Sequence, residues 1–178
     1  MKNFLLGLVA LFSSSISNAE PLQINQINET FNDLAYMFNH EQTDPIYKLD
    51  FLKNKELDFS YDSLKIVDQY LLEVRKTELD KLSNEQFTRI VVRAGAYVGE
   101  TIRRNDKSKQ WNWVDFENAQ KINPQFFNDS DKSLSYAAVL TDGQQFTFPL
   151  NKVMKFLNNG EEDSLYSYAI LSSQLAKY

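Results

Sequence analysis

The sequence predicts one α+β domain with about five helices and a small antiparallel sheet of about three strands. In its first two thirds, apolar residues recur every three or four positions, as they do on one face of a helix. Short aromatic and branched segments around Asp142 and Gly143 then replace this pattern, before a helical period returns. No linker, repeat or low-complexity tract divides the chain, so one domain is expected over residues 20–178.

The first two helices follow from apolar spacing and from turn signals. The first is expected to start near Pro21 and to end near His40, before the turn signal Asp44-Pro45. The second is expected to start with Ser60 as N-cap and Asp62 in its first turn. Their apolar faces are Ile24, Ile27, Phe31, Leu34 and Phe38, then Leu64, Val67, Leu71 and Val74.

The third helix should begin at Ser83, because Gln86 lies at the capping-box spacing, and should end near Asn105. Its apolar side is formed by Phe87, Ile90, Val91, Ala94, Val98 and Ile102. Gly95 and Gly99 fall on the adjoining side. Glycine weakens a helix interior by about 1 kcal/mol relative to alanine. Two glycines on neighbouring turns therefore indicate that another backbone passes very close, with this helix central and covered on two sides.

Three strands are expected at residues 111–116, 135–140 and 144–148. Asp142-Gly143 predicts a tight hairpin with positive φ at both central residues. Pro149 should start a helix that ends at Gly160. Residues 161–163 then form the acidic first turn of a final helix. The apolar positions are Leu150, Val153, Met154 and Leu157, then Leu165, Tyr168, Ser172 and Leu175.

Residues 1–19 have the pattern of a signal peptide. A basic start with Lys2 precedes a short apolar run, and small residues stand before a cleavage point after Ala19. The apolar run is shorter than the roughly 20 residues that span a bilayer. The alternative is an uncleaved, membrane-tethered helix. We expect a periplasmic or secreted protein with no membrane span after cleavage.

Composition excludes several classes of protein. The chain has no cysteine, so it forms no disulfide. It carries 19 basic and 24 acidic residues, a net charge of −5, which becomes about −6 when Lys2 is removed with the leader. An acidic surface repels phosphate backbones, so we expect no nucleic-acid partner. The sequence contains no indication of an oligomeric state.

No recognisable catalytic or cofactor motif is present, and we expect no cofactor, no metal and no catalytic residues. His40 is the only histidine, so a histidine-rich zinc site is excluded, and an exposed structural role is expected for it. Nucleophile-elbow, Walker and dinucleotide motifs are absent. Residues 128–131 are acidic enough to hold calcium weakly, but a solvated turn is the simpler interpretation.

One flank of the third helix is a stripe of polar residues. It consists of Arg89, Arg93, Tyr97, Glu100 and Arg104. One interpretation is a solvated face with ion pairs between residues four apart, each worth a few tenths of a kcal/mol. The other is a ligand-binding stripe, in which arginines grip a carboxylate or phosphate and Tyr97 adds a hydroxyl.

Two further groups are candidates for function. Trp111 and Trp113 share one face if their segment is a strand, and there they either stack on a sugar or peptide or join the sheet to the helices. A pair of carboxylates could support glycoside hydrolysis. The candidates for such a pair are Glu100, Asp115, Glu117, Glu161 and Asp163.

The segments "GAYVGETIRR" and "NGEEDSLYSYA", with the tryptophans and "DGQQFTFPLNKVMKFL" between them, resemble a widespread bacterial domain of uncharacterised function. The resemblance covers most of residues 57–169. Its most specific parts are a G-x-Y-x-G-E helix motif at residues 95–100 and a G-x-x-D-S-L segment at residues 160–165. It implies a small α+β domain, found alone or fused, and it assigns no catalytic residue.

These observations favour a non-enzymatic binding or inhibitory protein of the bacterial envelope. One form is an immunity protein that neutralises a basic toxin, since an acidic inhibitor attracts such a toxin by electrostatic steering. The alternatives are a carboxylate-based envelope hydrolase and a module that binds a small ligand or glycan.

Overall fold

The structure, a computed structural model, describes residues 20–77, 79–128 and 132–174. Within these ranges the chain folds as α+β, with seven α-helices and a three-stranded antiparallel sheet, which confirms the predicted class. The larger helices are α2 (Glu20–His40), α3 (Ser63–Arg75), α4 (Asn84–Asn105), α7 (Pro149–Asn159) and α8 (Leu165–Gln174). Short 3-10 helices span Leu49–Leu52, Leu79–Lys81, Leu134–Tyr136 and Glu161–Asp163. The predicted leader, most of the acidic segment at residues 128–131, and Leu175 lie outside the described residues.

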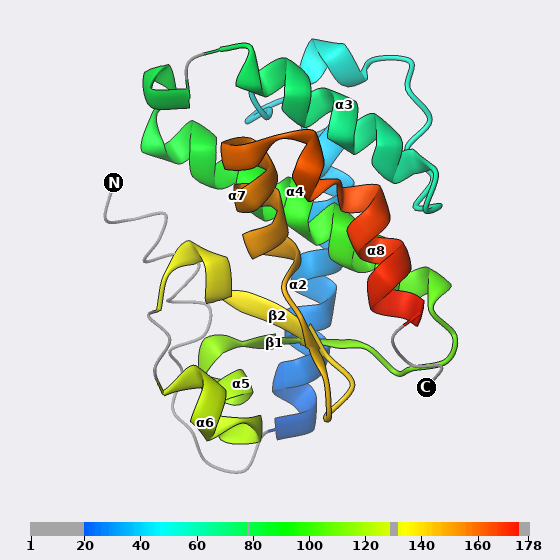
Figure 1. Cartoon of the computed structure of the whole chain (residues 1–178), viewed down its shortest axis with the longest axis vertical. Helices are drawn as coiled ribbons and strands as arrows, with labels where there is room; N and C mark the ends of the chain where they lie inside the picture. Colours follow the sequence, from blue (N-terminus) through cyan, green and yellow to red (C-terminus); the bar gives the residue numbers. More distant parts are fainter. Residues whose placement is uncertain (1–19, 78, 129–131, 175–178) are drawn as a thin grey trace.

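Helix α4 is the centre of the molecule. Figure 1 shows it crossing the larger half of the fold, with α3, α7 and α8 around it and α2 passing behind. Every residue from Ile90 to Ile102 is buried, so α4 is covered all round and not only on two sides. A helix buried on every face is expected to be apolar throughout. The polar residues of α4 therefore need partners inside the fold.

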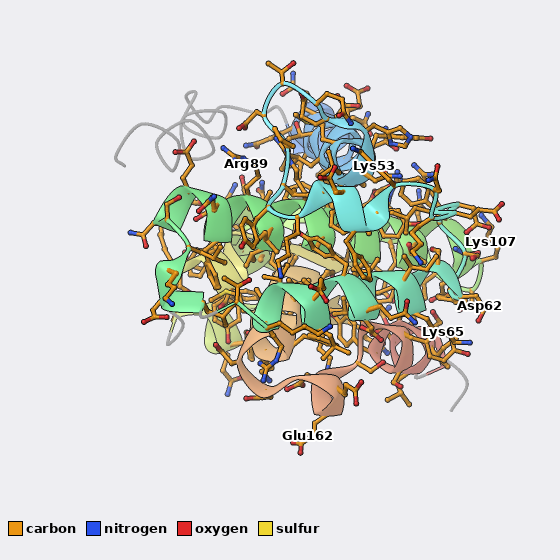
Figure 2. All side chains as sticks on the ribbon, turned by 90° about the horizontal axis from the view of Figure 1, so that it is seen from above. Lys53, Asp62, Lys65, Arg89, Lys107 and Glu162 are labelled. Carbon is orange, nitrogen blue, oxygen red and sulfur yellow. The ribbon has the colours of Figure 1, made fainter. Side chains whose placement is uncertain are left out.

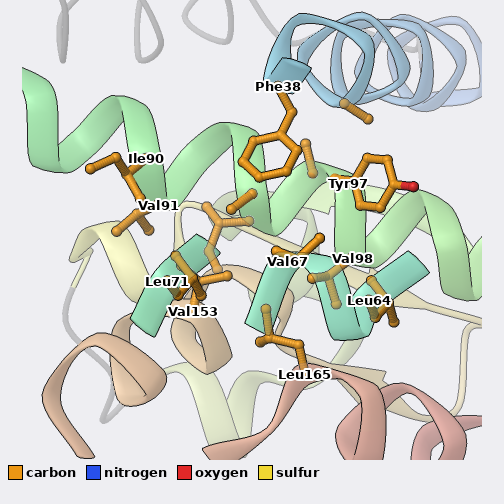
Figure 3. Close-up of a cluster of buried hydrophobic side chains, with 14 of the residues drawn as sticks. Phe38, Leu64, Val67, Leu71, Ile90, Val91, Tyr97, Val98, Val153 and Leu165 are labelled. Carbon is orange, nitrogen blue, oxygen red and sulfur yellow. The ribbon is translucent and has the colours of Figure 1, made fainter. Parts of the chain in front are cut away.

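The main core fills the space between α4 and the other four large helices. Figure 3 shows Phe38 of α2 on one side of α4, and Val67 and Leu71 of α3 on the other. Val153 of α7 and Leu165 of α8 complete the cluster. The predicted apolar faces thus meet around one helix.

The ends of these helices match the sequence signals in most cases. Ser83 and Gln86 form the predicted capping box. Gly160 ends α7 with a φ of 93°, as expected for a glycine stop. The Ser60 hydroxyl accepts from the Ser63 amide at 3.2 Å, although α3 itself starts at Ser63, later than predicted. The acidic residues after Gly160 form a separate 3-10 turn, so they are not the first turn of α8.

The sheet has the order β1 (Asn112–Asp115), β2 (Ala138–Thr141), β3 (Phe146–Thr147). The predicted hairpin between β2 and β3 exists, but its loop has four residues because Thr141 pairs with Phe146. Of the central pair only Gly143 has a positive φ, 92°. The carboxylate of Asp142 accepts from the amides of Gln144 (2.9 Å) and Gln145 (2.8 Å), which closes this wider loop.

Two short helices that the sequence pattern does not predict follow β1. Helix α5 (Phe116–Ile122) begins where a strand was expected to continue, because the Asp115 carboxylate caps it by accepting from the Asn118 amide at 2.8 Å. Helix α6 (Pro124–Phe127) is capped by Asn123. With one face of the sheet they enclose a small core, separate from the main one. It consists of Val114, Phe116, Ala119, Phe127 and Val139.

Candidate functional site

Most of the polar stripe of α4 is buried, which neither interpretation of it as a surface expected. Arg89 and Arg104 are partly exposed. Tyr97 and Glu100 are fully buried, and Arg93 is 3% exposed. The reason is that α2 and the connection between α2 and α3 cover this flank of α4. Each stripe residue therefore contacts another part of the chain.

Tyr97 holds the connection between α2 and α3. Its hydroxyl accepts from the Phe59 amide at 2.9 Å and bonds the Ser63 hydroxyl at 2.8 Å. Phe59 has a φ of 62°, which a bulky residue rarely adopts. The Asn105 amide group donates to the Phe59 carbonyl at 2.7 Å. Helix α4 thus holds both backbone groups of a strained residue.

Arg104 covers the same segment from outside. Its guanidinium lies 3.6 Å from the centre of the Phe59 ring, which also stacks on the ring of Tyr97 at 4.6 Å. Arg104 also donates to the side chain of Asn32 at 2.8 Å. These contacts join α2, the connection and α4, and a cation–aromatic contact of this kind contributes about 0.5–1 kcal/mol at partly exposed sites.

Glu100 is the buried anion of the stripe. Its carboxylate accepts from Trp113 Nε1 at 3.0 Å and from Arg103 Nε at 2.7 Å, and Arg104 Nε lies 3.4 Å away. The predicted pair between Glu100 and Arg104 is therefore present, with Arg103 as an additional partner. Because its oxygens already bind three donors, Glu100 has a structural role and no free face toward a substrate.

Arg93 anchors the loop after α2. It donates to the Asp44 carbonyl at 2.6 Å and lies 3.5 Å from the Asp44 carboxylate. Arg89 makes the predicted pair with Glu85 (3.0 Å) and also pairs with Asp44 (2.6 Å). Burial lowers the pKa of Arg93, while the Asp44 carboxylate partly offsets this effect.

The two tryptophans are also internal, so they do not form a surface for stacking on a sugar. Trp113 is fully buried, and its ring stacks on Phe31 of α2 at 4.1 Å. Trp111, 3% exposed, lies just before β1 and donates to the Asp106 carboxylate at 2.9 Å. Trp113 therefore joins the sheet to the helices, which was the simpler of the two expectations.

The glycines explain how these parts fit together. A Cβ atom on Gly95 would lie 3.0 Å from the Cα of Leu150, so the backbone of α7 approaches there as predicted. A Cβ atom on Gly99 would lie 2.1 Å from the Trp113 ring. The second close approach is thus an aromatic side chain rather than a backbone. Residues 94–105 are therefore a packing motif. Its polar side chains bond to other parts of the chain, and its glycines make room for α7 and Trp113.

The other candidate carboxylates lie in two places, at the start of α5 and in the 3-10 turn after α7. Asp115 caps α5, and burial raises its pKa despite the hydrogen bond from Asn118. Glu117 pairs with Lys132, and Asp163 pairs with Lys152. Glu161 is exposed on the 3-10 turn after α7. Glu117 is near enough for its charge to add to the rise in the pKa of Asp115, but Asp115 is engaged as a helix cap and Glu117 with Lys132.

An aromatic surface that no motif predicted lies over the small core. We define it by Phe126, Tyr136, Phe146 and Phe148, together with Ile122 at the end of α5. Phe126 and Ile122 are 45% and 42% exposed. The Phe126 ring lies 5.6 Å from Phe148 and 6.4 Å from Tyr136. The sequence contains one feature from which this surface could have been predicted. Phe126 and Phe127 are adjacent, and one short helix cannot bury both rings.

The outer amides of the sheet next to this surface have side-chain partners. On β1, the Trp113 amide donates to the side chain of Asn28 at 2.8 Å. After β3, the Phe148 amide donates to the Tyr168 hydroxyl at 2.6 Å. An open sheet edge would accept an added strand. Here the amides that such a strand would use at these two positions are already bonded.

His40 is exposed at the end of α2, as expected, with Nδ1 3.0 Å from the Tyr36 carbonyl. Among the described residues, no group of three or more His, Cys, Asp or Glu side chains could hold a metal ion. No helix in that part of the chain is long and apolar enough to cross a membrane. No family model, curated protein or solved structure matches the chain.

Proposed function

We propose that the protein is an exported, non-enzymatic binding protein whose partner is another protein of the bacterial envelope. The observation that carries this proposal is the aromatic surface around Phe126. Exposed apolar patches on soluble proteins mark interaction sites. Aromatic residues are enriched at protein interfaces, where a few of them supply most of the binding free energy.

The sheet edges limit how such a partner docks. Because the amides of Trp113 and Phe148 are bonded to side chains, a partner strand gains little by pairing there. The partner instead packs its side chains on the rings of Phe126, Tyr136 and Phe148. A hydrophobic anchor from the partner, inserted beside Phe126, is the contact that this surface favours.

The charge of the chain supports an inhibitory role. A net charge of −5 produces a long-range attraction for a basic protein and speeds their encounter. An immunity protein against a basic toxin of the envelope needs both this attraction and an apolar contact. The packing role of Glu100 and the capping role of Asp115 disfavour the alternative of a hydrolase. The burial of Trp111 and Trp113 disfavours binding of a glycan by these residues.

The experiment is photo-crosslinking at position 126 or 122 in the periplasm, followed by affinity measurements with the purified partner. Phe126→Ser and Ile122→Ser should each weaken binding by about 2 kcal/mol, as expected for a central interface residue. Leu171→Ser is the matched control, because Leu171 is 58% exposed but lies on α8. Ile122→Ser remains informative if Phe126→Ser alters the small core.

Unchanged affinity in both folded serine variants would refute the proposed surface. Equal weakening by Leu171→Ser would show that general hydrophobicity, and not this surface, controls binding. A catalytic turnover of envelope glycan that is lost in Asp115→Asn would favour the hydrolase.

A further inference from the structure

A shallow hollow lies where the end of α4 turns into β1. Its volume is about 420 Å³. It is lined mainly by Arg103, Asp106, Lys107, Ser108, Lys109 and Trp111. We call it the basic hollow. Figure 2 shows Lys107 at the outer edge of the molecule.

The charge of this segment is opposite to that of the whole chain. Between Glu100 and Lys109 there are four cations and two carboxylates, whereas the chain has a net charge of −5. The cations are Arg103, Arg104, Lys107 and Lys109. A local excess of positive charge on an acidic protein concentrates anions at that place.

The two carboxylates are Asp106, which neutral donors hold, and Glu100, which is buried with Arg103 and Arg104 as partners. Asp106 accepts from the Ser108 amide (3.0 Å) and hydroxyl (2.5 Å) with one oxygen, and from Trp111 Nε1 (2.9 Å) with the other. Burial alone would raise the pKa of Asp106, but these hydrogen bonds lower it. Glu100 is fully buried against Trp113. Among the described residues neither carboxylate forms a salt bridge with Lys107 or Lys109, although the charge of Lys109 adds to the lowering of the pKa of Asp106.

Arg103, Lys107 and Lys109 each have N–H groups that could donate hydrogen bonds to a ligand. Arg103 binds Glu100 through Nε and Nη2, which leaves Nη1 for another acceptor. Lys107 is exposed, and within the described ranges it makes no salt bridge. Lys109 donates to the neutral side chain of Gln145 at 2.7 Å and lies 4.7 Å from the Trp111 ring centre. All three groups line one hollow.

We propose that the basic hollow binds a phosphate group. A phosphate near neutral pH carries between one and two negative charges and several acceptor oxygens. Arginine offers it a planar set of donors, and each lysine offers a mobile ammonium group. A carboxylate has only two acceptor oxygens and a single charge, so it matches three cations less well. The phosphate belongs either to a small soluble ester or to a lipid headgroup.

The test is a titration of the full mature chain with glycerol 3-phosphate at low salt, followed by NMR of the indole N–H groups. Saturable binding should shift the signal of Trp111, which lines the hollow, and leave that of Trp113 in place. Lys107→Gln/Lys109→Gln should weaken the affinity about tenfold or more, because two charge-assisted contacts are lost. Lys53→Gln/Lys65→Gln is the matched control. It removes the same charge from two surface lysines paired with Asp50 and Asp62, and should bind as the wild type does.

Vesicles distinguish the two sources of the phosphate. Binding to phosphatidylglycerol but not to phosphatidylcholine vesicles, lost in Lys107→Gln/Lys109→Gln alone, assigns the hollow to a lipid headgroup. Binding of glycerol 3-phosphate without vesicle binding assigns it to a soluble ester. The proposal is overturned if neither ligand binds saturably, or if the two double variants lose affinity equally.

Discussion

The centre of α4 and the aromatic surface over the small core differ in which side chains they bury. The centre of α4 buries polar side chains, whereas the aromatic surface exposes apolar ones. In α4, charged and hydroxyl groups such as Glu100 and Tyr97 are buried and bonded to other parts of the chain. Over the small core, Phe126 and Ile122, which would suit an interior, are 45% and 42% exposed. In the sequence, residues 94–105 have the pattern of a site, whereas no pattern indicates that Ile122, Phe126 and the rings near them form one.

The difference shows that a motif of polar residues indicates strong hydrogen bonds. It does not indicate whether their partner is a ligand or another part of the same chain. Arginine, glutamate and tyrosine are suited to a ligand site because they make charge-assisted hydrogen bonds. A helix surrounded by other elements needs the same bonds to satisfy its own buried polar groups. The proposed binding surface therefore rests on exposed apolar side chains and not on this motif.

The largest effect is expected at Glu100. Glu100→Ala leaves the Trp113 indole N–H and the guanidinium of Arg103 without their buried acceptor. Breaking a buried pair in this way costs about 3–5 kcal/mol. Chemical denaturation measures the loss in free energy of unfolding, and Glu100→Gln, which keeps an acceptor oxygen, should lose less. Equal, small losses in both variants would place Glu100 on a solvated face after all.

The glycines should come next. Gly99→Leu and Gly95→Leu should each lower the free energy of unfolding by more than about 2 kcal/mol, because overpacking forces the neighbouring elements apart. Gly99 is the more sensitive position, since its Cβ would lie 2.1 Å from the buried Trp113 ring, against 3.0 Å from Leu150 at Gly95. Gly99→Ala should therefore cost more than Gly95→Ala. Wild-type stability in the alanine and leucine variants would mean that α4 is not tightly covered.

A smaller effect is expected at Asp115, which caps α5 beneath the aromatic surface. Burial raises the folded-state pKa of this carboxyl above its ordinary value of 3.8. Because the folded state binds the proton of Asp115 more tightly than the unfolded state does, protonated Asp115 stabilises the fold. This contribution to the free energy of unfolding falls as the pH rises from about 3.8 through the folded-state pKa. Asp115→Asn keeps a good N-cap and removes the titration.

Denaturation of Asp115→Asn between acidic and neutral pH checks this expectation. At neutral pH the variant should lie within about 1 kcal/mol of the wild type, since the cap is retained. Its stability should also depend less on pH across that window. A variant that becomes less stable relative to the wild type as the pH rises would contradict the direction of the shift.

Periodicity is sufficient to predict the five large helices, because their apolar faces meet around one buried axis. It fails after Trp113, where α5 and α6 are too short to show a helical period and depend on the caps Asp115 and Asn123. The spacing of the polar stripe predicts the pair between Glu100 and Arg104, which is present. The burial of the stripe was not predictable, because it depends on a connection that returns through Phe59 with a positive φ.

The central claim is that the polar stripe of α4, which includes Arg93 and Arg104, stabilises the fold through contacts with other parts of the chain. The most direct test is the free energy of unfolding of Arg93→Gln/Arg104→Gln, measured by chemical denaturation. A solvated or ligand-binding stripe predicts a loss below about 1 kcal/mol, as for exposed ion pairs. The contacts of the buried Arg93 with Asp44, and of the partly exposed Arg104 with Phe59 and Asn32, together predict a loss of about 2 kcal/mol or more. A folded double variant with wild-type stability would contradict the claim.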